Sequence, residues 1–389
     1  MANIRRCFMN GKTVDLPVWE GKNVFALYYN GYCVWKNGMD YNFITKWNID
    51  SQPFIFPAIE EIENKGFINW NDKNKDYEYD SSLTYSHNYE NGEQIVSIQC
   101  DITNVKDKAF IDLVNDENIS RLTYIEIPET IESIGKSAFK GCSLLTQVYI
   151  NGNKLEEIKD SSFWKCTSLT EIVIPKVIKI IGNNAFGYCS NLKSFPILSD
   201  VLYIGDFAFY NCNNLTGITL SNKLTYIGEY AFGYCEQLIS PIIIPSEVKK
   251  ISKCAFYCCK NILSVTFEDN GVEVIEDEAF DNCLRLSYIN FGNSLKSIGY
   301  SAFNFCTDLK NFVLPDTIES IGMLAFNACR GLTEIEIPNS IKDIGSTAFF
   351  NCTNIKTIRI HKPVDSIPNA PWGAGDYASG SSDTVVIWD

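Results

Sequence analysis

The residue types that most often carry catalysis are scarce in this chain. Histidine, the usual general base near neutral pH, occurs only twice, at His87 and His361. His87 lies in a polar, tyrosine-rich stretch, and His361 follows the last repeated strand segment. The two imidazoles are therefore expected to lie far apart and in solvent, which argues against histidine-based acid–base or triad chemistry.

Carboxylates are plentiful, and one pairing of them suggests hydrolysis. Glu334 and Glu336 project from the same side of a predicted strand. Paired carboxylates about 5 to 9.5 Å apart hydrolyse glycosides, but acidic pairs on a solvated strand are far more often plain polar exterior. The sequence lacks a G-x-G-x-x-G motif after a strand, a P-loop and a G-x-S-x-G motif. We therefore predict a protein that is not an enzyme and needs no cofactor.

Two stretches could be considered as metal sites. The stretch from Asp72 to Asp80 begins like a calcium loop, but Tyr77 occupies the position that needs glycine and Leu83 the position that needs glutamate. It fails as an EF-hand, and a polar loop is the better interpretation. The C-x-x-x-C-C cluster at 254–259 has neither a C-x-x-C partner pair nor a nearby histidine, which argues against zinc. No metal is predicted.

The charge and the hydropathy of the chain argue against some classes of partner and against a membrane span. The 389 residues carry a net charge of −14 and contain no run of Lys and Arg, which argues against a nucleic-acid partner. No apolar window is long enough to span a membrane. Residues 1–17 contain two arginines without a following apolar stretch, so they do not read as a signal peptide. We expect either a protein that is not secreted by that route or one whose leader was removed.

The elements that position any site come from an internal repeat, L-T-x-I-x-I-P-x-x-I-x-x-I-G-x-x-A-F-x-x-C. Its anchor phenylalanines are Phe110, Phe139, Phe163, Phe186, Phe209, Phe232, Phe256, Phe280, Phe303, Phe326 and Phe349. After a first gap of 29 residues, every spacing between them is 23 or 24. A period this regular predicts stacked supersecondary units that share one core.

Each unit predicts one short strand and one turn. In the segment 332–338, leucine and isoleucine alternate with glutamate, which marks a strand with one buried face. The proline stops the ladder, the glycine permits a turn, and S-x-A-F-x-x-C suits one helical or 3₁₀ turn. The sequence therefore predicts an α/β solenoid of about eleven repeats, with one parallel β-sheet face and short turns on the other.

Ten of the fifteen cysteines occupy one repeat position, three residues after the anchor phenylalanine. They are Cys142, Cys166, Cys189, Cys212, Cys235, Cys259, Cys283, Cys306, Cys329 and Cys352. Stacked in register, these side chains form a ladder with rungs roughly 5 Å apart, which is within disulfide reach. We favour free buried thiols, because disulfide frameworks belong to small domains with little core.

Four regions are predicted. Residues 1–45 contain Asn-Gly at 10–11 and 30–31 between β-prone segments, a hairpin signal, so we predict a small all-β module with Trp19 and Trp35 in its core. Residues 46–94 are polar and rich in Tyr and Asn, which predicts an irregular linker or degenerate capping region. Residues 95–360 form the solenoid, and residues 361–389 a C-terminal cap in which Trp372 and Trp388 cover the open end of the stack.

The repeat resembles BspA-like (Treponema-type) leucine-rich repeats, in about eleven copies over residues 95–389. The ending IPNAPWGAGD…TVVIW is similar to the C-terminal cap of such chains. The resemblance implies a leucine-rich-repeat horseshoe or arc that serves adhesion or recognition, commonly at the surface of bacteria or protists. It implies no catalytic residues.

The first 40 residues, with NGKTVDLPVW and VFALYYNGYCVW, are similar to short N-terminal modules of virion and tail-associated proteins of gut-bacterial phages. A virion protein assembled in the cytoplasm needs no signal peptide and fits reduced cysteines. We therefore predict a virion-associated component, a tail, fibre or capsid decoration that contacts other virion proteins through residues 1–45. The alternative is a secreted or cell-surface adhesin of the BspA type, and the third is a carbohydrate-active enzyme.

The outward residues of the strand face form the predicted binding surface for a protein or a cell-surface glycan. They are Tyr124, Glu126, Gln147, Tyr149, Glu171, Thr219, Thr266, Tyr288, Asn290, Glu334, Glu336 and Arg359. Tyrosine supplies amphipathic contact area at low entropic cost, as binding surfaces prefer. The alternative for any one of these positions is that its residue type differs from repeat to repeat because no binding function constrains it.

Overall fold

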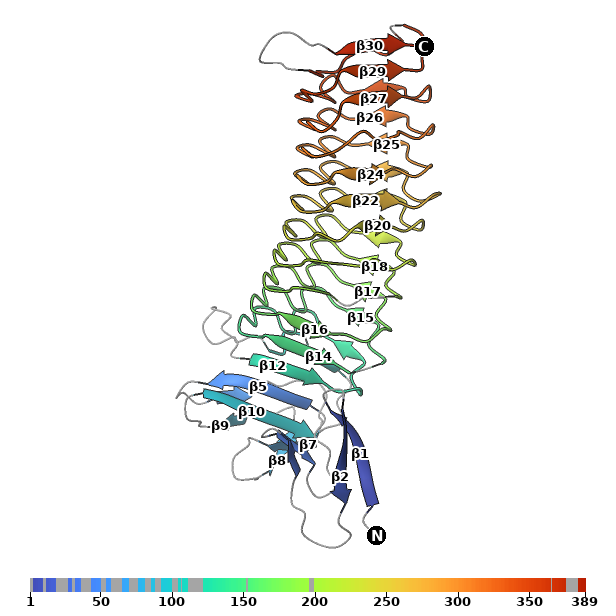
Figure 1. Ribbon diagram of the computed structural model, residues 1–389. Coiled ribbons are helices and arrows are strands. Elements are labelled where there is room, and N and C mark those ends of the chain that lie inside the picture. The colour runs from blue at the N-terminus through green and yellow to red at the C-terminus, as the bar shows by residue number, and fades with distance from the viewer. Residues whose placement is uncertain are drawn as a thin grey trace.

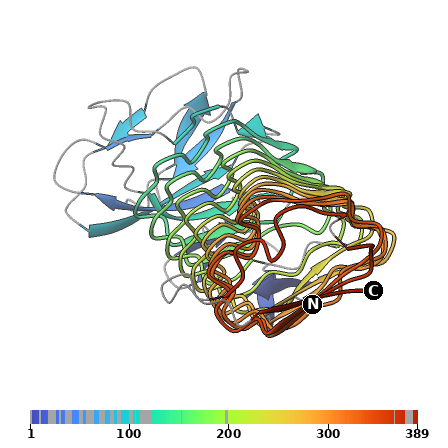
Figure 2. The same ribbon diagram turned by 90° about the horizontal axis from the view of Figure 1, so that it is seen from above.

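The computed structural model describes residues 104–105, 107–110, 122–151, 153–195, 199–364, 366–375 and 384–389 with their side chains, and the backbone of strands β1 to β10. The described repeats stack as a parallel β-solenoid of about ten turns, and the successive turns overlie one another along the stack (Figures 1 and 2). Each turn supplies residues to three faces, which we call the long-strand face, the short-strand face and the turn face.

The long-strand face consists of three groups of parallel strands. They are β12 (Leu122–Ile127), β14 (Gln147–Ile150) and β16 (Glu171–Val173); β20 (Ile242–Ile244), β22 (Ser264–Phe267) and β24 (Tyr288–Asn290); and β27 (Glu334–Ile337), β29 (Thr357–Ile360) and β30 (Val385–Trp388). In β27, Ile335 and Ile337 are buried while Glu334 and Glu336 are exposed, as the alternation predicts.

The short-strand face is a second parallel ladder that the sequence did not predict. It consists of β11 (Asn104–Val105), β13 (Ser133–Ile134), β15 (Glu157–Ile158), β17 (Ile180–Ile181), β18 (Tyr203–Ile204) and β19 (Tyr226–Ile227), then β21 (Lys250–Ile251), β23 (Val274–Ile275), β25 (Ser297–Ile298), β26 (Ser320–Ile321) and β28 (Asp343–Ile344). The prediction of a single sheet was wrong because a strand of two residues is too short to show an alternation.

The turn face contains no helix among the described residues, so the predicted α/β class is wrong for this part of the chain. Ser137 and Gly141 adopt positive φ of 57° and 77°, which interrupts any helical run. As a result, Ser137, Phe139 and Gly141 donate their backbone N–H groups to carbonyls of the next repeat at 3.0, 2.8 and 2.7 Å. The N–H groups between them bond three residues back within the repeat, so every backbone donor of the turn is satisfied.

These bonds also explain the shape. Because consecutive turns are hydrogen-bonded on the turn face as well as on the strand faces, a repeat has nearly the same thickness on every side. A horseshoe needs an outer face that is thicker than its sheet. The repeats form a nearly straight column from β20 to β30 in Figure 1, whereas the turns before β20 are displaced from one another in Figure 2.

The core is organised around one stack of rings. The eleven anchor phenylalanines from Phe110 to Phe349 lie face to face, with centroids 4.8 to 5.5 Å apart and planes within 12° of parallel. Trp372 follows at 6.2 Å from Phe349, is fully buried, and donates from Nε1 to the Pro368 carbonyl. Trp388 packs against the core from β30. Trp372 thus extends the ring stack beyond the last repeat, and the predicted cap stays a prediction.

The cysteine ladder runs beside the ring stack. All ten ladder cysteines are buried free thiols. Each Sγ donates to the carbonyl oxygen of the phenylalanine one repeat earlier, over 2.9 to 3.6 Å. Each thiol therefore has an acceptor of its own, and none needs its neighbour as a bonding partner.

The N-terminal strands are β1 (Asn3–Met9), β2 (Lys12–Val18), β3 (Leu27–Tyr29), β4 (Tyr32–Trp35), β5 (Phe43–Ile49), β6 (Phe54–Phe56), β7 (Lys65–Asn69), β8 (Asp76–Asp80), β9 (Tyr85–His87) and β10 (Gly92–Gln99). The antiparallel pairs β1–β2 and β3–β4 flank the two Asn-Gly dipeptides, which confirms both hairpins. The proposed core role of Trp19 and Trp35 and the environment of His87 lie outside the described side chains.

Residues 46–94 differ from the irregular segment expected from their composition. Strand β5 pairs antiparallel with β12 and with β10, which continues through β7 to β8. The long-strand sheet therefore extends beyond the first repeat. Local composition hides this, because β5 and β12 are paired across a long stretch of sequence.

The repeat glycines allow the turns to approach closely. A Cβ on Gly299 would lie 2.7 Å from the Asp277 nitrogen and 2.7 Å from the Glu276 carbonyl carbon, both backbone atoms that cannot move aside. We expect Gly299→Ala to lower the free energy of unfolding by about 1–3 kcal/mol, the usual cost of overpacking. Gly217→Ala is the matched control, because its Cβ would meet nothing closer than 3.9 Å. Urea denaturation of both variants tests this, and equal stabilities would contradict it.

Candidate binding face

Eleven of the twelve predicted binding residues lie in the long strands, in two outward columns, and Thr219 lies between β16 and β20 in a segment without a long strand. Register pairs Tyr124 with Gln147 and Gln147 with Glu171 in one column. Glu126 pairs with Tyr149 in the other. The predicted residues are spread along the whole length of the stack and do not converge on one point. The face is therefore suited to an extended contact and not to enclosing a small ligand.

At the N-terminal end of this face, the polar residues bond to one another. Gln147 Nε2 and the Tyr149 hydroxyl donate to the two carboxylate oxygens of Glu171, each at 3.1 Å. The Tyr124 hydroxyl donates to Glu126 over 3.3 Å, and the rings of Tyr124 and Tyr149 lie 5.7 Å apart. Partial burial, then the Glu171 carboxylate, raises the pKa of Tyr149. These hydrogen bonds favour one arrangement of the four side chains in the absence of a ligand.

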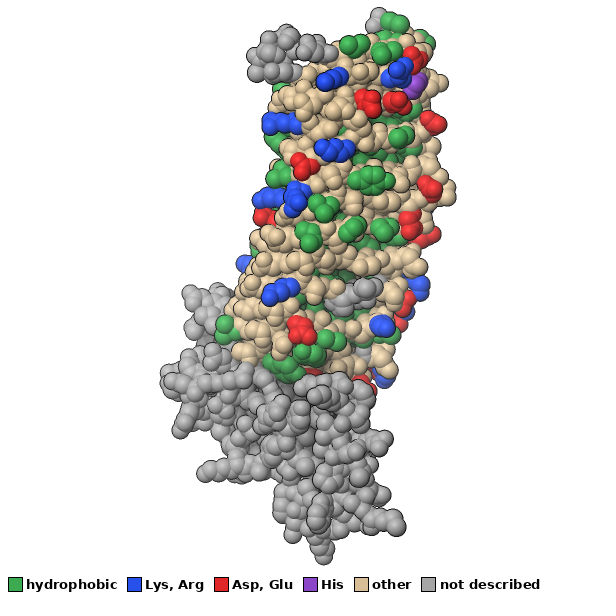
Figure 3. All heavy atoms as spheres, in the orientation of Figure 1, with side chains coloured by type: hydrophobic (Ala, Val, Ile, Leu, Met, Phe, Trp, Pro, Cys, Tyr) green, Lys and Arg blue, Asp and Glu red, His purple; other side chains and the backbone are tan. Residues whose placement is uncertain are grey.

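The centre of the face is apolar. Five large side chains are exposed there, namely Ile239 (50%), Ile243 (57%), Leu263 (41%), Tyr288 (56%) and Val313 (79%). We call this set the central patch. Four successive repeats contribute to it, and β20, β22 and β24 pair in register beneath it. Apolar side chains are visible along this part of the column in Figure 3.

Of this patch, the predicted site contains only Tyr288. The sequence did not predict Ile243 as an outward residue, because it is the middle one of three consecutive isoleucines and no alternation of apolar and polar residues is visible there. Its register position, opposite Thr266, is the signal that could have identified it. Ile239 and Leu263 precede the strands, at a position that is usually threonine or serine elsewhere in the repeat.

The two edges of the central patch carry opposite charge. The edge before the strands, which we call the basic edge, holds Lys260, Arg285 and Lys310 together with Glu236 and Asp308. Lys260 and Glu236 form an ion pair over 2.7 Å. Arg285, Lys310 and the exposed Asp308 remain, so this edge carries one more positive than negative charge. The edge after the strands, the acidic edge, holds Glu247, Glu268, Asp269 and Asp316, all exposed. It also holds one cation, Lys249, whose Nζ donates to the carbonyls of Ser246 and Asn270, each over 2.7 Å. Figure 3 shows red side chains along the right side of the column at this height, and blue side chains with some red ones among them along the left side.

The C-terminal end of the face is polar again. Asn311 Nδ2 donates to Glu334 over 3.2 Å, and Arg359 forms an ion pair with Asp389 over 3.0 Å. His361 Nδ1 lies 3.6 Å from the same Asp389 carboxylate. Across the residues with described side chains, no group of three or more His, Cys, Asp or Glu could hold a metal ion.

The turn face presents an aromatic zigzag that the sequence did not reveal. Trp164, Tyr188, Tyr210, Tyr234 and Tyr257 meet edge to face, with centroids 5.3 to 6.0 Å apart. Successive members alternate between one and two residues after the anchor phenylalanine. Glycine occupies the first of these positions wherever tyrosine holds the second, and a Cβ on Gly187 would lie 3.1 Å from Trp164. The rings are half-buried against each other, so this ridge stabilises the stack.

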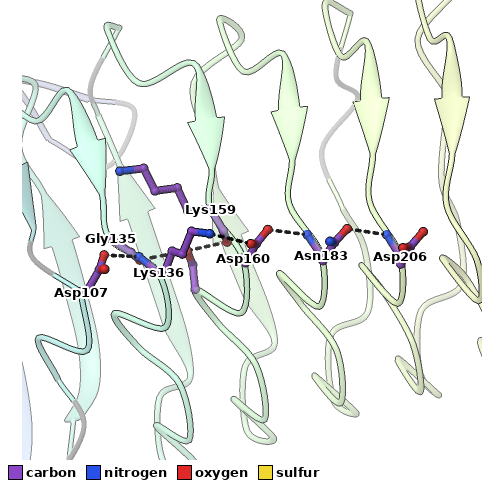
Figure 4. A network of polar contacts seen from close by, with 8 residues as sticks. Asp107, Gly135, Lys136, Lys159, Asp160, Asn183 and Asp206 are labelled. Carbon is purple, nitrogen blue, oxygen red and sulfur yellow. Dashed lines mark hydrogen bonds and ion pairs between the residues drawn. The ribbon is translucent and has the colours of Figure 1, made fainter.

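A polar ladder lies where the short-strand face meets the turn face (Figure 4). Asp107 accepts the N–H of Lys136, Asp160 that of Asn183, and Asn183 that of Asp206, over 2.7 to 3.0 Å. Further along, a shallow groove of about 570 Å³ crosses the short-strand face. Two of its acidic residues, Glu276 and Asp277, likewise accept backbone N–H groups of neighbouring repeats. These acids join the repeats to one another.

The repeat matches a known family of proteins. A family model described as the BspA type leucine rich repeat region (6 copies) matches residues 103–239, 179–310, 238–356 and 296–372. No curated protein matches the chain. Taken together, the matched segments extend over more than half of the chain.

Several solved structures are similar. One, of a leucine rich cell surface protein from Faecalibacterium prausnitzii, is 26% identical, with 69% of this chain and 85% of that chain covered and a TM-score of 0.39. A leucine-rich repeat protein from Bacteroides ovatus is 23% identical, with 78% and 90% covered and a TM-score of 0.43. The pneumococcal vaccine antigen PcpA is 22% identical, with 74% and 85% covered and a TM-score of 0.45.

Proposed function

Because this chain belongs to the BspA-type leucine-rich repeat family, we propose that it is a non-enzymatic recognition or adhesion protein that acts at a cell surface or outside the cell. Its repeats bind a protein partner through the long-strand face. The matched family is a repeat region typical of binding proteins, and the comparisons name no enzyme family. Among the described residues, no helix is long and apolar enough to cross a membrane.

The central patch is the observation that carries this proposal. Monomeric proteins rarely expose several large apolar side chains side by side, and such patches with polar rims mark interaction sites. Here the five residues of the patch stand between a basic and an acidic edge, with polar clusters above and below. An apolar centre surrounded by charge is the usual arrangement of a protein interface. A glycan partner, which the sequence left open, has less support from an aliphatic centre.

The predicted virion role has no support from the family match, which begins at residue 103 and does not reach residues 1–45. The secreted or surface adhesin, which was the alternative from sequence, fits the family better. Attachment to a larger assembly through residues 1–45, and capping by residues 361–389, remain proposals about this chain. Residues 46–94 would then join the module to the first repeat through β5.

Binding measurements on a single surface variant test the function. The full chain, fluorescently labelled, is titrated onto arrays of immobilised proteins, which include unlabelled copies of this chain and extracellular proteins, and onto arrays of glycans. We expect saturable binding to proteins, and at least tenfold weaker binding by Val313→Asp, because the change places an unpaired charge in the apolar patch, at its most exposed residue. Val313 is 79% exposed, so the fold tolerates the substitution. Binding confined to glycans, or unaffected by Val313→Asp, would contradict a protein-binding patch.

A further inference from the structure

The arrangement of charge around the central patch specifies the partner more closely. The net charge is positive on the edge before the strands and negative on the edge after them, over the same repeats. A complementary partner must therefore offer an apolar centre, with acid facing Arg285 and Lys310 and base facing Glu268, Asp269 and Asp316. The long-strand face itself has this composition.

Whether the faces of two copies are complementary depends on the direction of the two-fold axis that relates them. The charges on the two edges favour one direction. If a second copy is rotated by 180° about an axis parallel to the stack, its acidic edge meets the basic edge of the first copy on both sides of the patch. If the axis runs across the stack, basic edge meets basic edge and acidic meets acidic, which is repulsive. Only the first arrangement brings the patches together with favourable charge at both edges.

We propose that the central patch binds a second copy of this chain, forming a parallel two-fold dimer through the long-strand faces. The inference rests on the proposed function, since it names the protein partner of the same face. In the parallel arrangement each repeat meets the same repeat of the second copy. Lys310 and Asp316, which precede and follow the strand position of one repeat, then face Asp316 and Lys310 of that copy.

The shape of the column suits this contact. The turns from β20 to β30 nearly overlie one another when seen from above in Figure 2, so this part of the face has little curvature. Stable interfaces bury about 800 Å² per partner, more than a few apolar side chains supply, so the edges must take part as well as the patch. Like-charge repulsion between two chains of net charge −14 is screened beyond about 8 Å at physiological salt, whereas the edge contacts are shorter.

Sedimentation equilibrium of the full chain tests the dimer. We expect a concentration-dependent species of twice the 43.9 kDa monomer mass. Lys310→Glu should weaken the dimer at least tenfold, because it sets like charges together on both edges. The double variant Lys310→Glu with Asp316→Lys should restore it, because both pairs are then reversed. In the crosswise dimer Lys310→Glu would instead strengthen association, which would overturn the parallel arrangement.

Two further variants separate this inference from the proposed function. Val313→Asp should abolish the dimer, whereas Met323→Asp, at a 50% exposed residue beyond the long-strand face, should leave it intact. A wild-type chain that is monomeric at every concentration overturns the dimer. If that monomer still binds an arrayed protein and Val313→Asp removes the binding, the proposed function stands and only the choice of partner fails.

Discussion

Raising the pH from about 8 to about 10 should lower the free energy of unfolding by on the order of 10 kcal/mol. Burial raises the pKa of nine ladder thiols, from Cys166 to Cys352, above the ordinary value of 9.0. For Cys212 and Cys352 it raises the pKa to about 12. These thiols ionise in the unfolded chain but stay neutral in the folded one.

The sign follows from the raised folded pKa. Stability is fully present below the pKa of the unfolded thiol and is lost as pH rises from there toward the folded pKa. Each thiol contributes about 1.4 kcal/mol per pH unit in that window, and nine of them act together. Urea denaturation in reductant at a series of pH values measures the slope.

Cys212→Ala with Cys235→Ala provides the control for this prediction. Removing two of the nine titrating groups should reduce the slope by about a fifth, while the cavities lower stability at every pH alike. A flat profile to pH 10, or an unchanged slope in the double variant, would show that the ladder thiols do not cause the pH dependence.

Phe256→Ala should lower the free energy of unfolding by about 3–5 kcal/mol, the cost of removing a buried aromatic ring. Phe256 is fully buried and lies 5.2 Å from both Phe232 and Phe280, with nearly parallel planes. Its loss opens a gap in the stack that neighbouring repeats cannot close, because their backbones are hydrogen-bonded to each other on the turn face. Chemical denaturation followed by circular dichroism measures the change.

The matched substitution for this prediction is Phe305→Ala. Phe305 lies on the turn face and is 40% exposed, so its removal leaves no cavity. We expect a loss below about 1 kcal/mol, as for most surface changes. Equal losses in the two variants would mean that the ring stack is not what holds the repeats together.

The repeat, the alternating strand and the buried phenylalanines and cysteines could be predicted because a hydrophobic period records burial directly. The absence of a helix from the described turns could not, because it depends on positive φ at ordinary residues such as Ser137 and Phe207, which no sequence pattern announces. The short-strand ladder was hidden for a related reason: strands such as β13 are too short for a period. Their pairing depends on the stacking of neighbouring repeats.

The candidate site was predicted in part for similar reasons. Tyr288 was predicted because inward and outward residues alternate clearly in its repeat, whereas Ile243 lies in an unbroken apolar run. The charge on the two edges was not recognised, because Lys310 and Asp316 are placed on opposite sides of the patch only by the fold. A charged edge that several repeats build together can be recognised only when the register of the stacked repeats is known.

The alternation of the aromatic ridge has a consequence for how such a chain can change over evolutionary time. Trp164, Tyr210 and Tyr257 share one position, and Tyr188 and Tyr234 share the other, so the ridge repeats every second turn. Duplicating or deleting a single turn here would put two neighbouring repeats out of alternation, with their rings at the same position or with glycines at the same position. Gain or loss of turns in pairs would keep the ridge continuous. In this segment the heritable unit is therefore two repeats, although the folding unit is one.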